Sequence, residues 1–212
     1  MLSAVGIDMG LSAFVYTSDG ESFPAPRYLR RREDQLKRLQ RQLSRATKRT
    51  PKYRKILKAL QKCHHRIKCQ REDFLHKLAN HLLERYDIVV IEDLKISNMS
   101  RGPRPKQDEE TGEYLPNGAA AKGGLNKSIL DAGWGKFFQI LRYKAEALCK
   151  IVVAVPPHYT SQRCSACDLI VKKSLSTRTH RCSCGFVADR DFNAALNILR
   201  LGLESLFAGL AN

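Results

Sequence analysis

The amino-terminal segment is rich in branched and aromatic apolar residues, and short turns interrupt it. Residues 2–17 predict a strand, a tight turn that contains Gly10, and a second strand. The dipeptide Asp19-Gly20 is typical of hairpin turns, and a third short strand is expected near Ser22. The chain is therefore predicted to begin with an antiparallel meander.

From about Tyr28 the apolar residues recur at spacings of three and four, which is the period of an α-helix. Thr50-Pro51 interrupts this pattern, because proline lacks a backbone N–H and is tolerated only at the start of a helix. We expect a long basic helical hairpin over about residues 28–84, with its apolar stripe packed and its charged side chains facing solvent. The stripe comprises Leu36, Leu39, Leu43, Leu57, Leu60, Leu75, Leu78 and Leu82.

Two apolar runs predict buried strands at residues 88–91 and 151–155, and Pro156-Pro157 ends the second. Residues 101–124 show no periodicity, and their glycines, prolines and mixed charges predict a flexible surface loop. A helix capped by Asn126 or Ser128 is expected to run from there to Lys150. Its core stripe would consist of Trp134, Phe138, Leu141, Ala145 and Leu148.

The chain is strongly basic, and the excess charge is concentrated in the predicted hairpin. There are 37 Lys and Arg against 21 Asp and Glu, a formal net charge of +16, and residues 28–72 alone hold 17 Lys and Arg against three acids. A solvated helix face usually mixes both signs, so this segment favours nucleic-acid contact over solubility alone. An acidic protein or a membrane surface would be the other partners for such a run. The candidate phosphate contacts are Arg30, Arg31, Arg38, Arg45, Lys52, Arg54 and Lys58.

The length and hydropathy of the chain limit its class. With 212 residues and 43% apolar content it can bury one sizeable core and one small satellite module. No apolar run has the length of a transmembrane span, and no apolar segment follows a basic amino terminus as in a signal peptide. We therefore expect a cytoplasmic protein without a membrane partner.

Three acidic residues stand where predicted elements begin or end. Asp8 and Glu92 terminate apolar strands, and Asp191 opens a helix. A carboxylate at the point where a buried strand reaches the surface costs desolvation free energy unless a cation binds it, and divalent metal ions are the usual cation. The three acids therefore predict a metal-dependent phosphodiester enzyme. Asp93 points to the opposite strand face from Glu92, and Asp189 is either a rival of Asp191 or the cap of its helix.

Four of the seven cysteines are spaced as a metal site. Cys164 and Cys167 are followed after fourteen residues by Cys182 and Cys184, which predicts two knuckles facing each other across a β-hairpin and a structural, tetrahedral zinc site. The second pair has one intervening residue where knuckles commonly have at least two, and His180 is an alternative ligand. Gly185 would supply the positive φ that a knuckle requires. The remaining cysteines, Cys63, Cys69 and Cys149, are expected to be structural.

Several short strings occur in a fixed order along almost the whole chain. They are Gly6-Ile7-Asp8-Met9-Gly10, Ile91-Glu92-Asp93-Leu94, Leu125-Asn126-Lys127-Ser128-Ile129, Tyr159-Thr160-Ser161-Gln162-Arg163-Cys164, Cys184-Gly185, and Asp189-Arg190-Asp191-Phe192-Asn193-Ala194-Ala195-Leu196-Asn197-Ile198. This series resembles TnpB, the OrfB family of insertion-sequence proteins, and the last string is its most specific part.

The resemblance implies an α/β, RNase H-like (RuvC) nuclease fold with the basic hairpin and an inserted zinc ribbon. The implied boundaries are 1–159 for the nuclease core, 160–187 for the ribbon, and 188–212 for the final motif and helix. The family's metal-binding acids fall on Asp8, Glu92 and Asp191, which selects Asp191 over Asp189, and its zinc ligands fall on the four clustered cysteines. TnpB proteins are RNA-guided DNA endonucleases, are related to type V CRISPR effectors, and are often labelled transposases.

The implied chemistry uses two Mg²⁺ or Mn²⁺ ions about 4 Å apart for an in-line phosphodiester displacement. Magnesium suits a site of three carboxylates, because it prefers oxygen ligands and retains waters. Arg190 either contacts phosphate beside this site or pairs with a neighbouring acid.

The implied partners are DNA, most of all a single strand, and a guide RNA, in the prokaryotic cytoplasm beside the nucleoid. TnpB proteins normally carry an amino-terminal half that grips the guide RNA, whereas here Met1 lies seven residues before Asp8. We expect that half to be absent, so that the chain would be a natural short form, a gene fragment or an excised domain, and a second chain could supply the missing half. The alternatives are a non-catalytic nucleic-acid-binding or regulatory module, and a strand-transfer transposase acting in DNA recombination.

Overall fold

A mixed five-stranded sheet forms the centre of the protein. The structure, a computed structural model, describes residues 2–174 and 177–210. Strands β1 (Ala4–Met9), β2 (Ala13–Thr17) and β3 (Ser22–Pro24) form an antiparallel meander, while β4 (Ile88–Glu92) and β7 (Ile151–Val155) continue the sheet parallel to β1. The strand order is β3-β2-β1-β4-β7. The predicted meander and the predicted central strand, which is buried along its whole length, are both confirmed.

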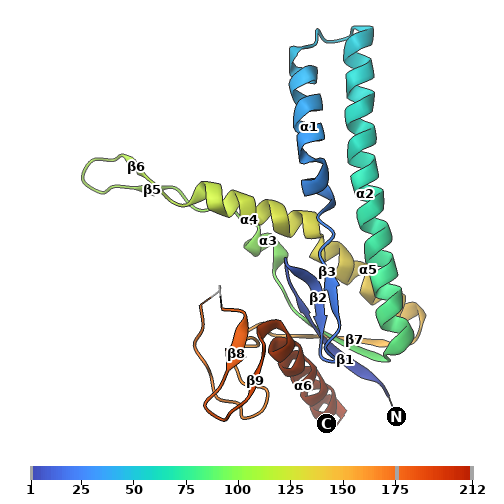
Figure 1. Cartoon of the computed structure of the whole chain (residues 1–212), viewed down its shortest axis with the longest axis vertical. Coiled ribbons are helices and arrows are strands. Elements are labelled where there is room, and N and C mark those ends of the chain that lie inside the picture. Colours follow the sequence, from blue (N-terminus) through green and yellow to red (C-terminus); the bar gives the residue numbers. More distant parts are fainter. Residues whose placement is uncertain (1, 175–176, 211–212) are drawn as a thin grey trace.

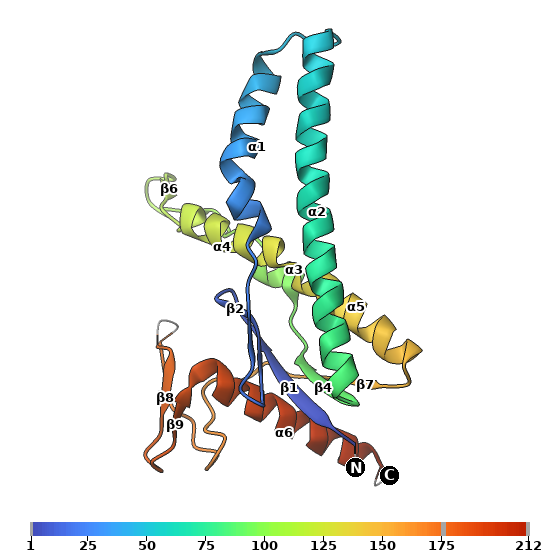
Figure 2. The ribbon, with the colours of Figure 1, turned by 45° about the vertical axis from the view of Figure 1, so that its right-hand side comes forward.

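Helices cover both faces of this sheet (Figures 1 and 2). Helices α2 (Pro51–Arg85) and α5 (Trp134–Ala147) pack on one face together with Val5 and Ile7 of β1, and α6 (Arg190–Leu210) crosses the other. Val90 of β4 packs against Ile198 on the α6 side. The result is a mixed α/β fold of three layers.

Helix α6 lies close against the sheet because two glycines permit it. A Cβ atom on Gly6 of β1 would lie 2.3 Å from the Ala195 carbonyl oxygen, and one on Gly202 of α6 would lie 2.4 Å from Cγ1 of Val90. Neither distance is compatible with a methyl group, so glycine at both positions sets the spacing between β1, β4 and α6.

The basic segment forms the predicted helical hairpin, which projects away from the sheet (Figure 1). Helix α1 (Tyr28–Arg45) runs antiparallel to the first part of α2, and Thr50 caps α2 by accepting a hydrogen bond from the Tyr53 amide at 3.2 Å. Leu36, Cys63 and Ile67 form a small core between the two helices. The structural role expected for Cys63 is confirmed.

The segment between β4 and β7 is more ordered than expected. It contains α3 (Ile96–Met99), a hairpin of β5 (Lys106–Gln107) and β6 (Tyr114–Leu115), and α4 (Ala119–Ala132). The prediction of a flexible surface loop over 101–124 is therefore wrong at β5, at β6 and at the start of α4. The three consecutive alanines at 119–121 have the highest helix propensity, which explains why α4 starts there.

The single helix expected from Asn126 or Ser128 to Lys150 is also wrong. Gly133 has a φ of 75° and separates α4 from α5, since a residue in the left-handed region cannot continue a helix. Most of the predicted stripe is buried, but Leu148 is 55% exposed because α5 ends at Ala147. Cys149, expected in a packed helix, is exposed just beyond that end.

Strand β7 is the edge of the sheet, so its predicted full burial is wrong. Ile151 is 42% exposed, Ala154 is also exposed, and Val155 is buried. Beyond β7 a compact module contains the short hairpin of β8 (Thr179–Arg181) and β9 (Val187–Asp189). Within residues 2–174 and 177–210, no helix has both the length and the apolar character needed to cross a membrane.

Candidate active site and cysteine cluster

The sheet places Asp8 and Glu92 on the same face and at the same end. Strands β1 and β4 are parallel, with Gly6 paired to Val90, and each acid lies two residues further along its strand. Side chains alternate between the two faces of a strand. Because Gly6 and Val90 face α6, Asp8 and Glu92 face the same side. Asp191 lies in the first turn of α6, and its charge acts on Asp8.

Burial and mutual repulsion make this site unfavourable for negative charge. Desolvation raises the pKa of Asp8 well above its usual value, and the carboxylates of Glu92 and Asp191 raise it further. Glu92 is 7% exposed, and burial raises its pKa, although Thr160 Oγ1 donates a hydrogen bond of 2.6 Å to Glu92 Oε1 that acts in the opposite direction. Such a group of carboxylates can be stabilised by cations.

Two arginines lie beside Asp191. The Arg190 guanidinium contacts Asp191 Oδ1 at 2.9 Å, and that of Arg178 lies 3.5 Å from Asp191 Oδ2. Arg190 therefore pairs with a neighbouring acid, which was one of its two expected roles. Arg178 was not predicted, because it stands in a segment without periodicity; it also donates to Ser12 Oγ in the turn after β1, at 3.3 Å.

The other two acids considered from the sequence have separate roles. Asp189 Oδ1 accepts hydrogen bonds from the backbone amides of Asp191 and Phe192, at 2.8 and 3.3 Å, so it caps α6. Asp93 is exposed and pairs with Lys95 at 2.6 Å, away from Glu92. These contacts confirm the capping alternative for Asp189 and the outward direction expected for Asp93.

The four cysteines predicted to bind zinc lie together. The Sγ atoms of Cys164, Cys167, Cys182 and Cys184 all lie within 4.8 Å of one another. Gly185 has the expected positive φ, 91°. His180 is outside the cluster; its side chain is fully buried and its Nδ1 contacts Lys173 Nζ. Within the described residues, no comparably tight group of potential metal ligands occurs elsewhere, so the three acids are more widely spaced than the thiols.

The thiols of the cluster influence one another. The pKa of Cys182 is lowered to about 6, first by a backbone hydrogen bond from Cys184 and then by the neighbouring thiols, against the opposing effect of desolvation. A backbone hydrogen bond from Leu169 lowers the pKa of Cys167, but desolvation and the other three thiols outweigh it and raise the value to about 12. This is the behaviour of thiols so close that one negative charge disfavours the next, and a bound cation would relieve it.

Two buried asparagines join the cysteine module to α6. Asn193 donates to the Arg163 carbonyl at 2.8 Å and accepts from the Ser165 amide at 3.0 Å. Asn197 donates to the carbonyls of Thr160 and Arg163 at 2.9 and 2.7 Å. The helix that carries Asp191 thus holds both the first cysteine knuckle and the threonine that contacts Glu92.

Comparisons with known proteins agree with this arrangement. Residues 2–102 match the family OrfB_IS605, described as "Probable transposase", and residues 134–198 match the "Cas12f1-like, TNB domain". The chain is 40% identical over 209 residues to "Putative RNA-guided DNA endonuclease InsQ" of Escherichia coli K12, covering 98% of this chain and 51% of that protein. It is 34% identical over 209 residues to "Putative RNA-guided DNA endonuclease" of Streptomyces pristinaespiralis, covering 98% of this chain and 47% of that protein.

The chain belongs to the TnpB (OrfB) family. It spans about half the length of the relatives that it matches. Its fold is similar to that in the cryo-EM structure of the Cas12f1–sgRNA–target DNA complex, with a TM-score of 0.57 at 18% identity, over 92% of this chain and 49% of that chain. In this TnpB-family chain the two matched segments divide the three acids: Asp8 and Glu92 lie in the first, and Asp191 in the second.

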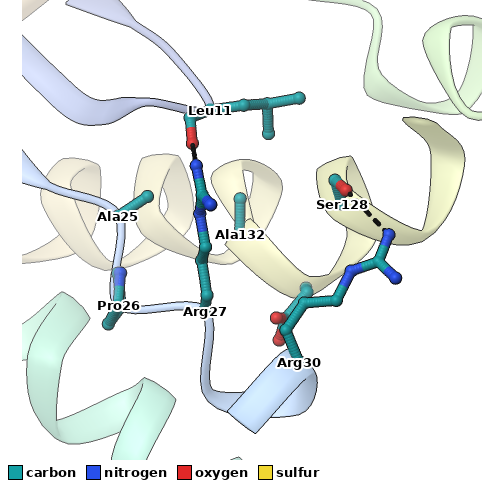
Figure 3. A pocket seen from close by; sticks show the side chains of 8 residues that line it. Leu11, Ala25, Pro26, Arg27, Arg30, Ser128 and Ala132 are labelled. Carbon is teal, nitrogen blue, oxygen red and sulfur yellow. Dashed lines mark hydrogen bonds between the residues drawn. The ribbon is translucent and has the colours of Figure 1, made fainter. Parts of the chain in front are cut away.

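The hairpin presents most of its predicted phosphate contacts to solvent. Arg31, Arg38, Arg45, Lys52, Arg54 and Lys58 are all exposed. Arg30 is also exposed, but it lies at the root of the hairpin, where its guanidinium contacts Glu33 at 3.2 Å and Ser128 of α4 at 3.5 Å (Figure 3). Arg27, just before α1, donates to the Leu11 carbonyl in the turn after β1 (Figure 3). The hairpin root is therefore tied to the loop that follows Asp8.

Asp131 completes this junction. Its carboxylate, 6% exposed, pairs with Arg71 of α2 at 2.9 Å and accepts from the Leu29 amide at 3.2 and 3.3 Å. Helix α1 has no side-chain cap of its own, so an acid from α4 supplies the negative charge at its amino terminus. No feature of the sequence indicated this tertiary cap.

Proposed function

We propose that this chain is the divalent-metal-dependent nuclease part of an RNA-guided DNA endonuclease, with an RNase H-like (RuvC) fold. The observation that carries the proposal is the position of Asp8, Glu92 and the start of α6 on one face of the sheet, where burial and the carboxylates of Glu92 and Asp191 raise the pKa of Asp8. The strand order and the antiparallel meander followed by parallel strands support the RNase H-like assignment.

The donor set fits Mg²⁺ or Mn²⁺. Three carboxylates offer the hard oxygen ligands these ions prefer, and a divalent cation offsets both the burial and the repulsion that raise the pKa of Asp8. When bound, a pair of such ions supplies an activated water and stabilises the leaving oxygen of a phosphodiester. Thr160 orients Glu92 through its hydrogen bond, and Arg178, which is half exposed, is within reach of a substrate phosphate beside Asp191.

The cysteine cluster fits a structural zinc ion. Four thiols within 4.8 Å of one another match a closed tetrahedral site, which leaves no open position for catalysis. Residues 160–187 would then form the zinc ribbon of a nuclease core comprising 1–159 and 188–212. Zinc in this proposal fixes the ribbon, and the carboxylates perform the chemistry.

The substrate and partners follow from charge and from the relatives. The exposed cations of the hairpin suit the phosphates of DNA or RNA. Relatives named as RNA-guided DNA endonucleases support a guide RNA as partner and a DNA strand as substrate. Because this chain spans about half of those proteins, guidance would require residues beyond this chain or a second protein.

A cleavage assay with matched variants tests the proposal. The purified chain should cut labelled single-stranded DNA with Mg²⁺ but not with EDTA. Glu92→Ala should abolish cutting, whereas Asp93→Ala, which changes the adjacent exposed acid, should retain it; circular dichroism confirms that both variants fold. Cutting by a folded Glu92→Ala variant would refute the active site. Metal-independent binding without cutting would instead support the non-catalytic binding module.

A further inference from the structure

Helix α4 crosses the root of the hairpin (Figure 2). Side chains of α2 and α4 line a groove at this crossing, which we call the α2–α4 groove. Its volume is about 790 Å³, and its surface is mainly apolar. Leu29, Ile67 and Leu130 form its apolar part, and Leu130 is 58% exposed. If the charges of the hairpin served only to keep the protein soluble, an apolar groove beside them would not be expected.

Two polar atoms in the lining lack partners. Asn126 Oδ1 and Arg71 Nε are buried and have no hydrogen-bond partner among the described residues. An unsatisfied buried polar atom is costly, so each requires an explanation. In the string from Leu125 to Ile129, Lys127 pairs with Glu33 and Ser128 contacts Arg30, whereas the Asn126 acceptor has no such role in the fold.

The charge around the groove favours an anionic ligand. Lys127 and Lys68 belong to the lining; Lys127 pairs with Glu33, whereas Lys68 is 68% exposed at its side chain and is 3.9 Å from Glu72. Asp131 also belongs to the lining, but its charge is balanced by Arg71 at 2.9 Å. A ligand that suits this surface has an apolar face, a polar edge and a neighbouring negative charge.

An unpaired nucleotide has these three features. The faces of its base are apolar, its edge carries donors and acceptors that an asparagine amide can pair with, and its phosphate suits the lysines. We propose that the α2–α4 groove binds the base of one unpaired nucleotide in a strand held along the hairpin. Asn126 contacts the edge of the base and Leu130 its face. The inference rests on the proposed nucleic-acid binding by the hairpin, but not on catalysis.

The test measures binding by the full chain in EDTA, so that no cleavage is needed. Short fluorescent single strands, each abasic at one position, are compared with the intact strand by fluorescence anisotropy, in DNA and in RNA of the same sequence. One abasic position should weaken binding by about tenfold. Asn126→Ala and Leu130→Glu should each weaken binding of the intact strand by a similar factor, and should weaken binding of that abasic strand little further.

Leu125→Glu is the matched control, because Leu125 is on the same helix, is 44% exposed and is outside the groove. This variant adds the same charge as Leu130→Glu, and the one abasic position should still weaken its binding by about tenfold. The proposal is overturned if no abasic position weakens binding more than the others, or if Leu125→Glu and Leu130→Glu lose equal affinity for the intact strand. It is also overturned if Asn126→Ala and Leu130→Glu weaken binding of the intact and the abasic strands alike. Base-dependent binding without Mg²⁺-dependent cutting would refute the nuclease and leave the groove supported. The DNA and RNA series identify which strand supplies the nucleotide.

Discussion

Gly6→Ala should separate the three candidate carboxylates without touching any of them. Gly6 is buried where β1 meets α6, and its new methyl carbon would lie 2.3 Å from the Ala195 carbonyl oxygen and 2.5 Å from the Leu199 amide nitrogen. Both are backbone atoms of a helix, so no side chain can rotate away. Restoring an ordinary contact of 3.4 Å requires α6 to retreat by about 1 Å at Ala195. Asp191, one turn earlier, would move with it.

The expected cost follows from this displacement. Overpacking a close-packed core destabilises by about 1–3 kcal/mol, which lowers the melting temperature of a chain of this size by about 2–12 °C. A misplacement of about 1 Å at a reacting centre can reduce the rate by about 100-fold. Thermal unfolding by circular dichroism and single-turnover cleavage of labelled DNA with saturating Mg²⁺ measure the two effects.

Gly102→Ala is the matched control, since a Cβ there has no atom within 4 Å. It should change neither the melting temperature nor the cleavage rate appreciably. If Gly6→Ala behaves like Gly102→Ala, the close approach of β1 and α6 is not what positions the site. A lower melting temperature with an unchanged rate at a temperature where the variant is folded would refute the link between this contact and the carboxylates.

Three further predictions concern the acids, the thiols and the hairpin root. The pKa of Asp8 is raised in the folded state, so the stability linked to its protonation is present at low pH and is lost as pH rises through the folded pKa. In EDTA at pH 8, the free energy of unfolding of Asp8→Asn, measured in urea, should therefore exceed that of the wild type by about 0.5–2 kcal/mol. A difference in this free energy that widens on acidification would contradict the prediction. Cys167→Ser should abolish a one-to-one zinc content measured by mass spectrometry, whereas Cys69→Ser, outside the cluster, should keep it. Asp131→Ala leaves Arg71 of α2 without its ion pair and the Leu29 amide of α1 without its acceptor, so it should cost about 1–3 kcal/mol in urea unfolding. Asp73→Ala, which removes an exposed pair, should cost less than about 1 kcal/mol, and equal losses would argue against the tertiary cap.

The elements that were correctly predicted depend on local periodicity. The meander, the hairpin with its break at Thr50-Pro51, and the buried strand β4 each carry a pattern that is complete within a few residues. The clustering of the four cysteines belongs to the same category, because their spacing alone brings four thiols together across a hairpin. The acids required one more step, namely that parallel strands end at the same edge of a sheet, and the register of β1 with β4 agrees with it.

The errors arose where a residue type permits two structures and tertiary contacts decide between them. Gly133 could have continued a helix at a modest cost; instead it adopts a φ of 75°, and a Cβ atom there would lie 3.1 Å from Cδ of Arg71. The exposed half of β7 has the same apolar letters as a central strand, and only the sheet order shows that nothing pairs with its outer edge among the described strands. Arg178 and Thr160 reach the acids across the fold, and no spacing along the chain encodes those distances.

The cysteine module is part of the candidate active site rather than an appendage to it. Asn193 and Asn197 are buried on α6, two and six residues after Asp191, and both bind the backbone that leads from Thr160 into the first knuckle. From the other side of the module, Arg178 reaches both Asp191 and the turn after β1. A change in the module is thereby transmitted to Glu92 through Thr160 and to Asp191 through α6 and Arg178. A metal ion bound by the thiols would accordingly affect the rate of cleavage by holding the acids in position, although it would take no part in the reaction itself.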